Sequence, residues 1–111
     1  MEKTDILDPL FASRRDLTRL IVDLTPASDE ERDALDRLVE ARDRVNATIR
    51  AVIDAQFRAV ASPELAAATT ALGAASKDLA RLEKVISSVN KAIEIAGKVA
   101  ELAGKAVALG G

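Results

Sequence analysis

The chain lacks most of the side chains on which enzymes depend, because it contains no cysteine, histidine, tyrosine or tryptophan. The absence of cysteine excludes disulfides and thiolate metal sites, and the absence of histidine excludes the Glu-x-x-His ligands of di-iron helical bundles. General acid–base and nucleophilic catalysis rely mainly on histidine, cysteine, tyrosine or a serine beside an activating base. The serines lie in no nucleophile motif, and the five glycines form no phosphate-binding loop. We therefore predict a protein that is not an enzyme and that uses no cofactor or metal.

A strong charge of one sign is also missing, since 16 Lys and Arg residues are balanced by 18 Asp and Glu residues. Nothing in this balance favours binding to a polyanion. The basic cluster of Arg14, Arg15 and Arg19 on the first predicted helix is diluted by Asp16 and Asp23. No aromatic residue is placed to stack a base, so we predict no nucleic-acid partner.

Long apolar runs are absent as well. The chain has no run of about eighteen uncharged apolar residues, which argues against an ordinary membrane-spanning helix. The polar first residues, Met1 to Asp5, lead into no apolar segment of the kind that a secretory signal contains. We expect a soluble, cytoplasmic protein, although export by a route without such a signal would leave no trace of this kind.

Alanine is what the chain has in abundance. Twenty-two of the 111 residues are alanine, whereas Phe11 and Phe57 are the only aromatic residues. A chain of this length forms one domain with a modest core. Alanine buries little area per residue but lets helices approach closely. The composition therefore predicts a single all-α domain whose apolar residues are spread thinly along its helices.

Three sequence signals mark the predicted helix starts. Asp8-Pro9 and Ser62-Pro63 each place a side-chain acceptor before a proline at the first helical position. The segment from Ser28 to Glu31 matches a capping box with extra acid in the first turn. The predicted order is an N-terminal arm over 1–8 and helices over 9–24, 29–60 and 63–109.

The last predicted helix carries a heptad pattern. A lysine returns at every seventh residue from Lys77 to Lys105, opposite an apolar seam with 3-4-3-4 spacing. We predict an elongated antiparallel helical bundle with coiled-coil-like heptad packing, in which the second and third helices form a hairpin. The bundle would have three helices, or four if the last helix breaks near Gly73, where helix propensity is low.

Helix lengths predict that the last helix outreaches its partners. A continuous helix would project by about 15 residues, on the order of 20 Å, beyond the helices that cover it. The projecting stretch is apolar around most of its circumference, and Gly97 and Gly104 would let a neighbouring backbone come close. The predicted interaction surface consists of Ile95, Gly97, Val99, Leu102, Ala103, Gly104, Ala106, Val107 and Leu109.

Three alternatives could cover this stretch. It could fold back into the core of its own chain, associate with copies of itself or with another protein's helices, or insert into a lipid interface or pore. Its polar stripe of Glu94, Lys98, Glu101 and Lys105 is nearly neutral, unlike that of helices that seek lipid surfaces. We predict a non-catalytic helical interaction or assembly module that self-associates or binds a partner helix. The alternative is a membrane-active protein, such as a small pore-former or a component of a secretion apparatus.

A row of carboxylates on the second predicted helix is the one arrangement that could suggest a metal-dependent enzyme. Spacing of 4-3-4-3 aligns Asp29, Asp33, Asp36, Glu40 and Asp43. Paired carboxylates one turn apart can hold Mg²⁺. Arginines flank this row, however, and the row faces away from the apolar stripe. We therefore predict a solvated, ion-paired face rather than a metal site.

Overall fold

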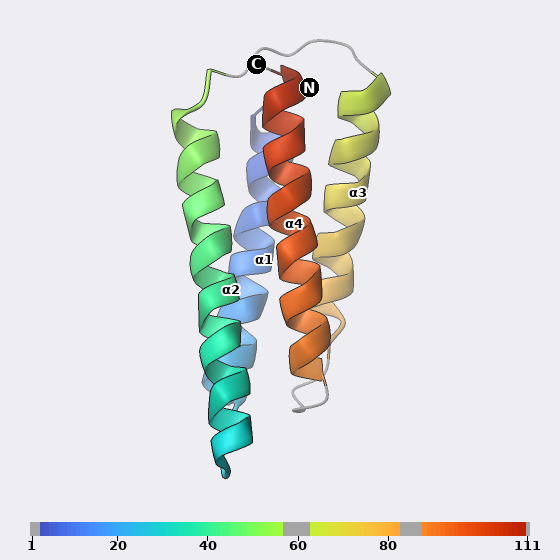
Figure 1. The fold of residues 1–111 in the computed structure, drawn as a ribbon. Coiled ribbons are helices and arrows are strands. Elements are labelled where there is room, and N and C mark those ends of the chain that lie inside the picture. The colour runs from blue at the N-terminus through green and yellow to red at the C-terminus, as the bar shows by residue number, and fades with distance from the viewer. Residues whose placement is uncertain (1–2, 57–62, 83–87, 111) are drawn as a thin grey trace.

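The computed structural model describes residues 3–56, 63–82 and 88–110, which form four helices and no strand. The helices are α1 (Thr4–Asp23), α2 (Asp29–Asp54), α3 (Pro63–Ala80) and α4 (Val89–Gly110). They lie side by side along the long axis of a molecule that measures 49 × 23 × 16 Å (Figure 1). The predicted all-α helical bundle is confirmed, and it has four helices, the number expected if the last predicted helix is divided.

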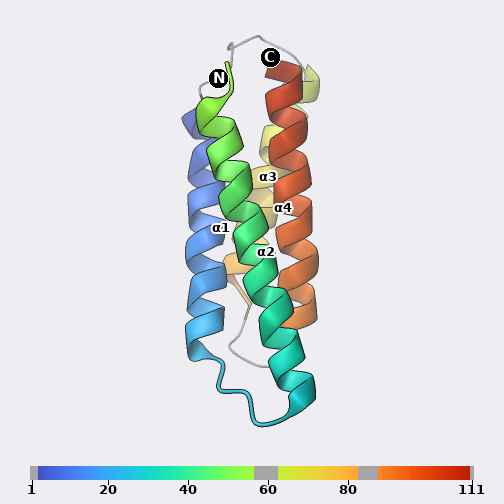
Figure 2. The ribbon, with the colours of Figure 1, turned by 60° about the vertical axis from the view of Figure 1, so that its left-hand side comes forward.

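The helices occupy the four corners of the bundle. Both α1 and α4 pack against α2 and against α3, and they also approach each other across the core. Figures 1 and 2 show that α1 and α3 run in one direction and α2 and α4 in the other. The predicted hairpin of the second and third helices is wrong, because α2 and α3 are antiparallel but stand at opposite corners and share almost no contact. The space between them is filled by α1 and α4.

The first helix begins at Thr4, and not at the predicted start, Pro9. Pro9 therefore lies inside α1, where it removes one backbone hydrogen bond. Burial of Ile6, which is inaccessible to solvent, holds the added turn in place. The Lys3 ammonium also ties this end of α1 to α2, since it donates a hydrogen bond of 2.8 Å to the carbonyl of Ile53. Tertiary contacts have outweighed the local start signal, so the predicted arm over 1–8 is wrong for residues 4–8, which are helical.

The predicted N-cap of α2 at Ser28 is confirmed, whereas the Glu31 carboxylate binds the residue before the cap instead of the cap itself. The Ser28 hydroxyl accepts a hydrogen bond from the Glu31 N–H at 3.2 Å, and the Glu31 carboxylate accepts one from the Ala27 N–H at 2.7 Å. The helix ends at Asp54, earlier than the predicted end at residue 60. The Lys3 ammonium, directly before α1, donates hydrogen bonds to the carbonyls of Ile53 and Ala55 at this end, where carbonyls have no intrahelical partner. Residues 57–62, including the predicted end, lie outside the described residues.

The stretch predicted as one helix over 63–109 is divided in two. The helix that starts at Pro63, as predicted, ends at Ala80, and α4 starts at Val89. Gly73 lies within α3, so the predicted position of the break is wrong. The division lets both halves bury their apolar faces in one core, which a continuous helix longer than its partners cannot do.

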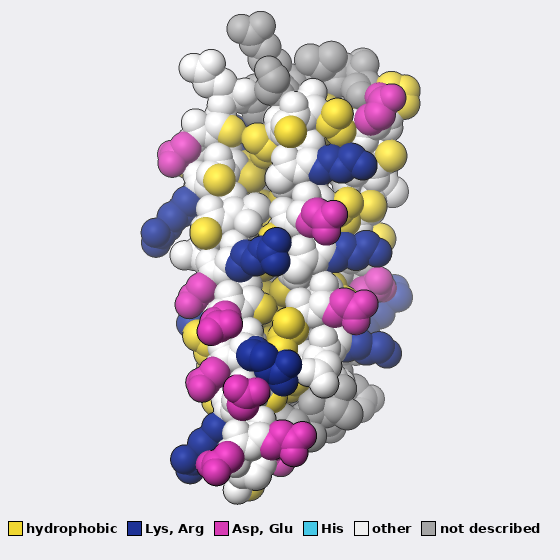
Figure 3. All heavy atoms as spheres, in the orientation of Figure 1, with side chains coloured by type: hydrophobic (Ala, Val, Ile, Leu, Met, Phe, Trp, Pro, Cys, Tyr) yellow, Lys and Arg dark blue, Asp and Glu magenta, His cyan; other side chains and the backbone are white. Residues whose placement is uncertain are grey.

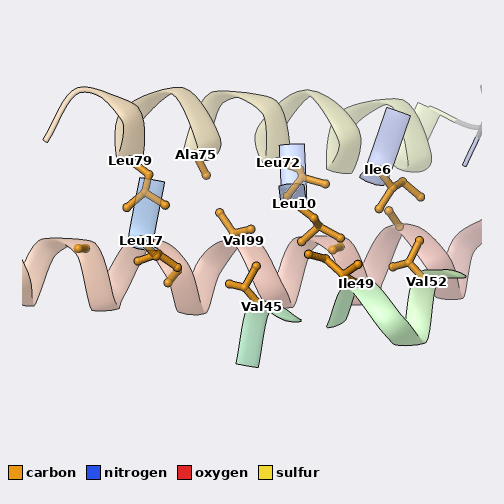
Figure 4. Close-up of a cluster of buried hydrophobic side chains, with 14 of the residues drawn as sticks. Ile6, Leu10, Leu17, Val45, Ile49, Val52, Leu72, Ala75, Leu79 and Val99 are labelled. Atoms are coloured by element: carbon orange, nitrogen blue, oxygen red, sulfur yellow. The ribbon is translucent and has the colours of Figure 1, made fainter. Parts of the chain in front are cut away.

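The core runs along the bundle and takes side chains from all four helices. Leu10 and Leu17 of α1, Val45 of α2, Leu72 of α3 and Val99 of α4 are fully buried and lie close together in Figure 4. Besides valines, α4 contributes alanines, namely Ala92, Ala96, Ala100, Ala103 and Ala106. Small side chains let α4 approach its neighbours closely. This central position decides which part of α4 remains on the surface.

Candidate interaction surface

The outer face of α4 follows from the heptad pattern of its sequence. Apolar positions that recur at spacings of three and four fall on one side of a helix, and the remaining positions face solvent. In α4 the apolar side is buried from Val89 to Ala106. The lysine row turns outward, with Lys77, Lys91, Lys98 and Lys105 exposed and Lys84 outside the described residues.

Most of the predicted interaction surface lies inside the bundle. The buried members are Val99, Ala103 and Ala106, and the half-buried members are Ile95, Leu102 and Val107. The prediction that this stretch outreaches its own chain is therefore wrong, because the helix divides and α4 packs against α2 and α3. Of the three alternatives for this stretch, the structure shows the first, in which it folds back into the core of its own chain.

Of the remaining members, Gly104 and Leu109 are exposed and Gly97 is half-buried. A Cβ atom at Gly104 would meet no neighbouring element within 4 Å, and one at Gly97 would meet only the Arg44 guanidinium, at 3.8 Å. Glycine within a helix costs about 0.5–1 kcal/mol relative to alanine. The packing of a single chain therefore gives no reason for glycine at either position.

Charged side chains of alternating sign follow the centre of this face. Glu94, Lys98, Glu101 and Lys105 are all exposed. Figure 3 shows positive and negative side chains alternating along α4, with apolar surface between them and beside them. None of the four makes an ion pair with another residue in the described part of the chain. Their charges are therefore available to a second molecule.

The carboxylate row of α2 faces solvent, as predicted. Its exposed members are Asp29, Asp33, Asp36, Glu40 and Asp43. The Arg37 Nε lies 3.4 Å from an Asp33 carboxylate oxygen, which pairs charges within the row. Over residues 3–56, 63–82 and 88–110, no three acidic side chains converge into a group that could hold a metal ion.

Two further findings bear on the class of protein. Comparisons with protein-family models, with curated proteins and with solved structures find no match. Of the helices formed by the described residues, none is both long enough and apolar enough to span a lipid bilayer.

A second surface brings together arginines that are distant in the sequence. Arg14 and Arg15 of α1 line a groove with Arg42 of α2. Arg19, which the sequence groups with the first two, lies outside this groove and pairs with an aspartate of its own helix. An aromatic residue lies beside Arg14, because the Arg14 guanidinium carbon is 5.2 Å from the centre of the Phe11 ring. The sequence signal for this groove is Arg42, which interrupts an otherwise apolar stripe.

Proposed function

We propose that the chain is a non-catalytic helical assembly module that self-associates through the outer face of α4. Two copies pair with their α4 helices antiparallel and in coiled-coil-like contact. The observation that carries the proposal is the self-complementary order of charges along this face. The surface differs from the predicted one, because the apolar side of α4 serves the core and the polar side is left for the second copy.

An antiparallel pair of α4 helices matches all of these charges at once. Lys98 and Glu101 are equidistant from the peptide bond that follows Val99, and so are Glu94 and Lys105. A two-fold axis at that bond sets Lys98 of one copy opposite Glu101 of the other, and Glu94 opposite Lys105. A parallel pair in register would set like charges against each other, which is unfavourable.

Small residues beside the charges leave room for the second helix. Gly97 and Gly104 are seven residues apart and so lie on the same side of the charged stripe, and Ala108 follows one turn later. No neighbouring element occupies the space over Gly104. Small residues permit two helix backbones to approach closely. Pairing of two α4 helices would therefore explain the glycines at these positions, which the packing of a single chain does not.

The expected dimer is weak and sensitive to salt. Exposed ion pairs contribute about 0.2–1 kcal/mol each, and the stripe from Glu94 to Lys105 is about 16 Å long. Charges on such a surface determine the orientation of the pair more than its affinity. Raising the NaCl concentration from roughly 50 to 500 mM should therefore weaken the association.

Charge reversal tests the pairing in sedimentation-velocity experiments over a range of protein concentrations. Lys98→Glu and Glu101→Lys should each weaken self-association, because each variant opposes like charges at two symmetric positions. A mixture of the two variants should associate. In the Lys98→Glu chain positions 98 and 101 are both acidic and in the Glu101→Lys chain both are basic, so opposite charges face each other in the mixed pair. Lys77→Glu, a charge reversal on the exposed side of α3, is the matched control and should leave association unchanged.

Two results would contradict the proposal. One is a wild-type chain that stays monomeric at the highest concentration that sedimentation analysis reaches. The other is a mixture of Lys98→Glu and Glu101→Lys chains that associates no better than either variant alone. Circular dichroism of each variant establishes that the bundle is folded, so that a loss of association is not a loss of structure.

A further inference from the structure

Side chains of α1 and α2 line a cationic groove on the surface of the bundle. It has a volume of about 490 Å³, and Arg14, Arg15 and Arg42 line it together with a single carboxylate, Asp43. The chain as a whole carries a net charge of −2. Positive charge is therefore concentrated here against the overall balance, which favours an anionic occupant.

The cationic centre of the groove is partly held in position. The Arg14 guanidinium donates a hydrogen bond of 2.8 Å to the Asn46 side-chain carbonyl, and it also lies over the Phe11 ring. The Arg42 guanidinium is 3.9 Å from the Asp43 carboxylate, a loose contact. Arg15 is exposed and makes no ion pair with any described residue. A fixed guanidinium beside two less constrained ones suits recognition of carboxylates.

Exposed apolar side chains lie on the same faces of α1 and α2 as the residues that line the groove. Phe11, Val22 and Ile53 are 38%, 73% and 51% exposed. Val22 lies eleven residues after Phe11 and Ile53 seven after Asn46, so each falls on the groove side of its helix. The surface thus has an arginine centre with apolar side chains toward both ends of α1.

We propose that this groove binds an amphipathic helix of another protein, with carboxylates in its central turns and apolar residues at both ends. A small anion would occupy only the arginine centre and leave Val22 and Ile53 exposed. A helix of about four turns, roughly 22 Å long, matches the extent of the surface. Single-stranded nucleic acid is disfavoured, because Phe11 is the one aromatic residue among the described residues that line the groove, and the Arg14 guanidinium already lies over one face of its ring.

The chain's own acidic row is a poor occupant for this groove. Arg37 pairs with Asp33 within that row, and Arg32 and Arg44 also flank it. Its positive charges would oppose the arginines of the groove. The groove is therefore assigned to a different protein, and it lies on other helices than the α4 face through which two copies of this chain would pair.

A peptide-display selection against the full chain tests this site. The library presents helical peptides of about 18 residues with randomised positions on one face. Enriched peptides should carry two or three Asp or Glu residues at helical spacing between apolar residues. A fluorescent peptide from this set should bind Arg15→Glu at least about tenfold more weakly than wild type, and Arg15→Glu/Arg42→Glu more weakly still.

Matched variants separate this site from the rest of the surface. Arg32→Glu reverses an exposed charge of α2 outside the groove and should leave peptide affinity unchanged. Lys98→Glu should also leave it unchanged, which distinguishes a failure of this proposal from a failure of α4 pairing. The proposal would be overturned if no peptide is enriched, or if the enriched peptides lack acidic residues. It would also be overturned if the affinity of the peptide is the same for Arg15→Glu as for wild type. So would a fluorescent oligonucleotide that binds through Arg15 and Arg42 when no peptide does.

Discussion

The Ser76 hydroxyl donates a hydrogen bond of 3.1 Å to the backbone carbonyl of Pro9, which joins α3 to α1. The Ser13 hydroxyl donates to the same carbonyl at 2.8 Å, from one turn further along α1. Both serines are buried. Buried polar groups need partners, so this shared carbonyl fixes how the two helices lie against each other within an otherwise apolar contact.

Replacing Ser76 with alanine is expected to lower the free energy of unfolding by about 0.5–1.5 kcal/mol. The Pro9 carbonyl keeps Ser13 as a donor, so the substitution leaves no buried acceptor without a partner. Ser76→Val should cost more, because it also adds volume to a packed contact. Urea denaturation followed by circular dichroism measures both effects. A wild-type stability for Ser76→Ala would show that the bond contributes nothing to the fold.

Val99→Ala is expected to lower the free energy of unfolding by about 1.5–3 kcal/mol. Val99 is fully buried between helices (Figure 4), so the loss of two methyl groups leaves a cavity. The same substitution at Val22, which is 73% exposed, is the matched control and should change stability by less than about 0.5 kcal/mol. Equal effects at the two sites would mean that α4 does not return into the core.

Gly104→Ala and Gly73→Ala are each expected to raise the free energy of unfolding by about 0.5–1 kcal/mol. Neither glycine has a neighbouring element within 4 Å of a Cβ position, so helix propensity decides both outcomes. Leucine at the same positions separates folding from assembly. Gly104→Leu should weaken self-association in sedimentation experiments, whereas Gly73→Leu should not. Equal association of the two leucine variants would argue against close pairing of α4 helices.

Lys3→Met is expected to destabilise the bundle by about 1–2 kcal/mol. The Lys3 ammonium donates hydrogen bonds to the carbonyls of Ile53 and Ala55, at 2.8 and 2.6 Å. The last turn of α2 contains no basic residue of its own, so methionine leaves those carbonyls to water. Thermal unfolding compared with Lys77→Met, at an exposed position, checks the effect. An equal melting temperature for both variants would contradict it.

Lipid vesicles loaded with a fluorescent dye are expected to remain intact when the full chain is added. The apolar side of α4 is occupied by contacts with the other helices, so inserting it into lipid would require the bundle to open. Dye release measured against complete release by detergent checks this expectation. Release by the folded wild-type chain would instead favour the alternative of a membrane-active protein.

The starts of α2 and α3 could be predicted because their signals are local. Ser28 and the residues after it satisfy the first turn of α2 by themselves, and Pro63 is preorganised for a first turn. The division between α3 and α4 has no comparable mark, since neither glycine nor proline occurs from residue 74 to 96. The serines before Val89 are the one available signal, because serine favours helix starts.

The α4 charge stripe and the arginine groove also differ in whether the sequence could predict them. The charge stripe of α4 could be predicted from spacing, because one helix carries all of it. The arginine groove could not, because Arg14 and Arg42 come together only once α1 packs against α2. Arg19 is only five residues from Arg14 and yet lies elsewhere, since its position on the helix turns it toward a different neighbour.

By itself the sequence determined that the chain is all helical and which side of α4 faces solvent, because both follow from periodicity along a single helix. Only the tertiary structure decided that the apolar side of α4 is covered by its own chain. That outcome depends on where a long helix divides, and the division is favoured by apolar area that becomes buried only when distant segments meet.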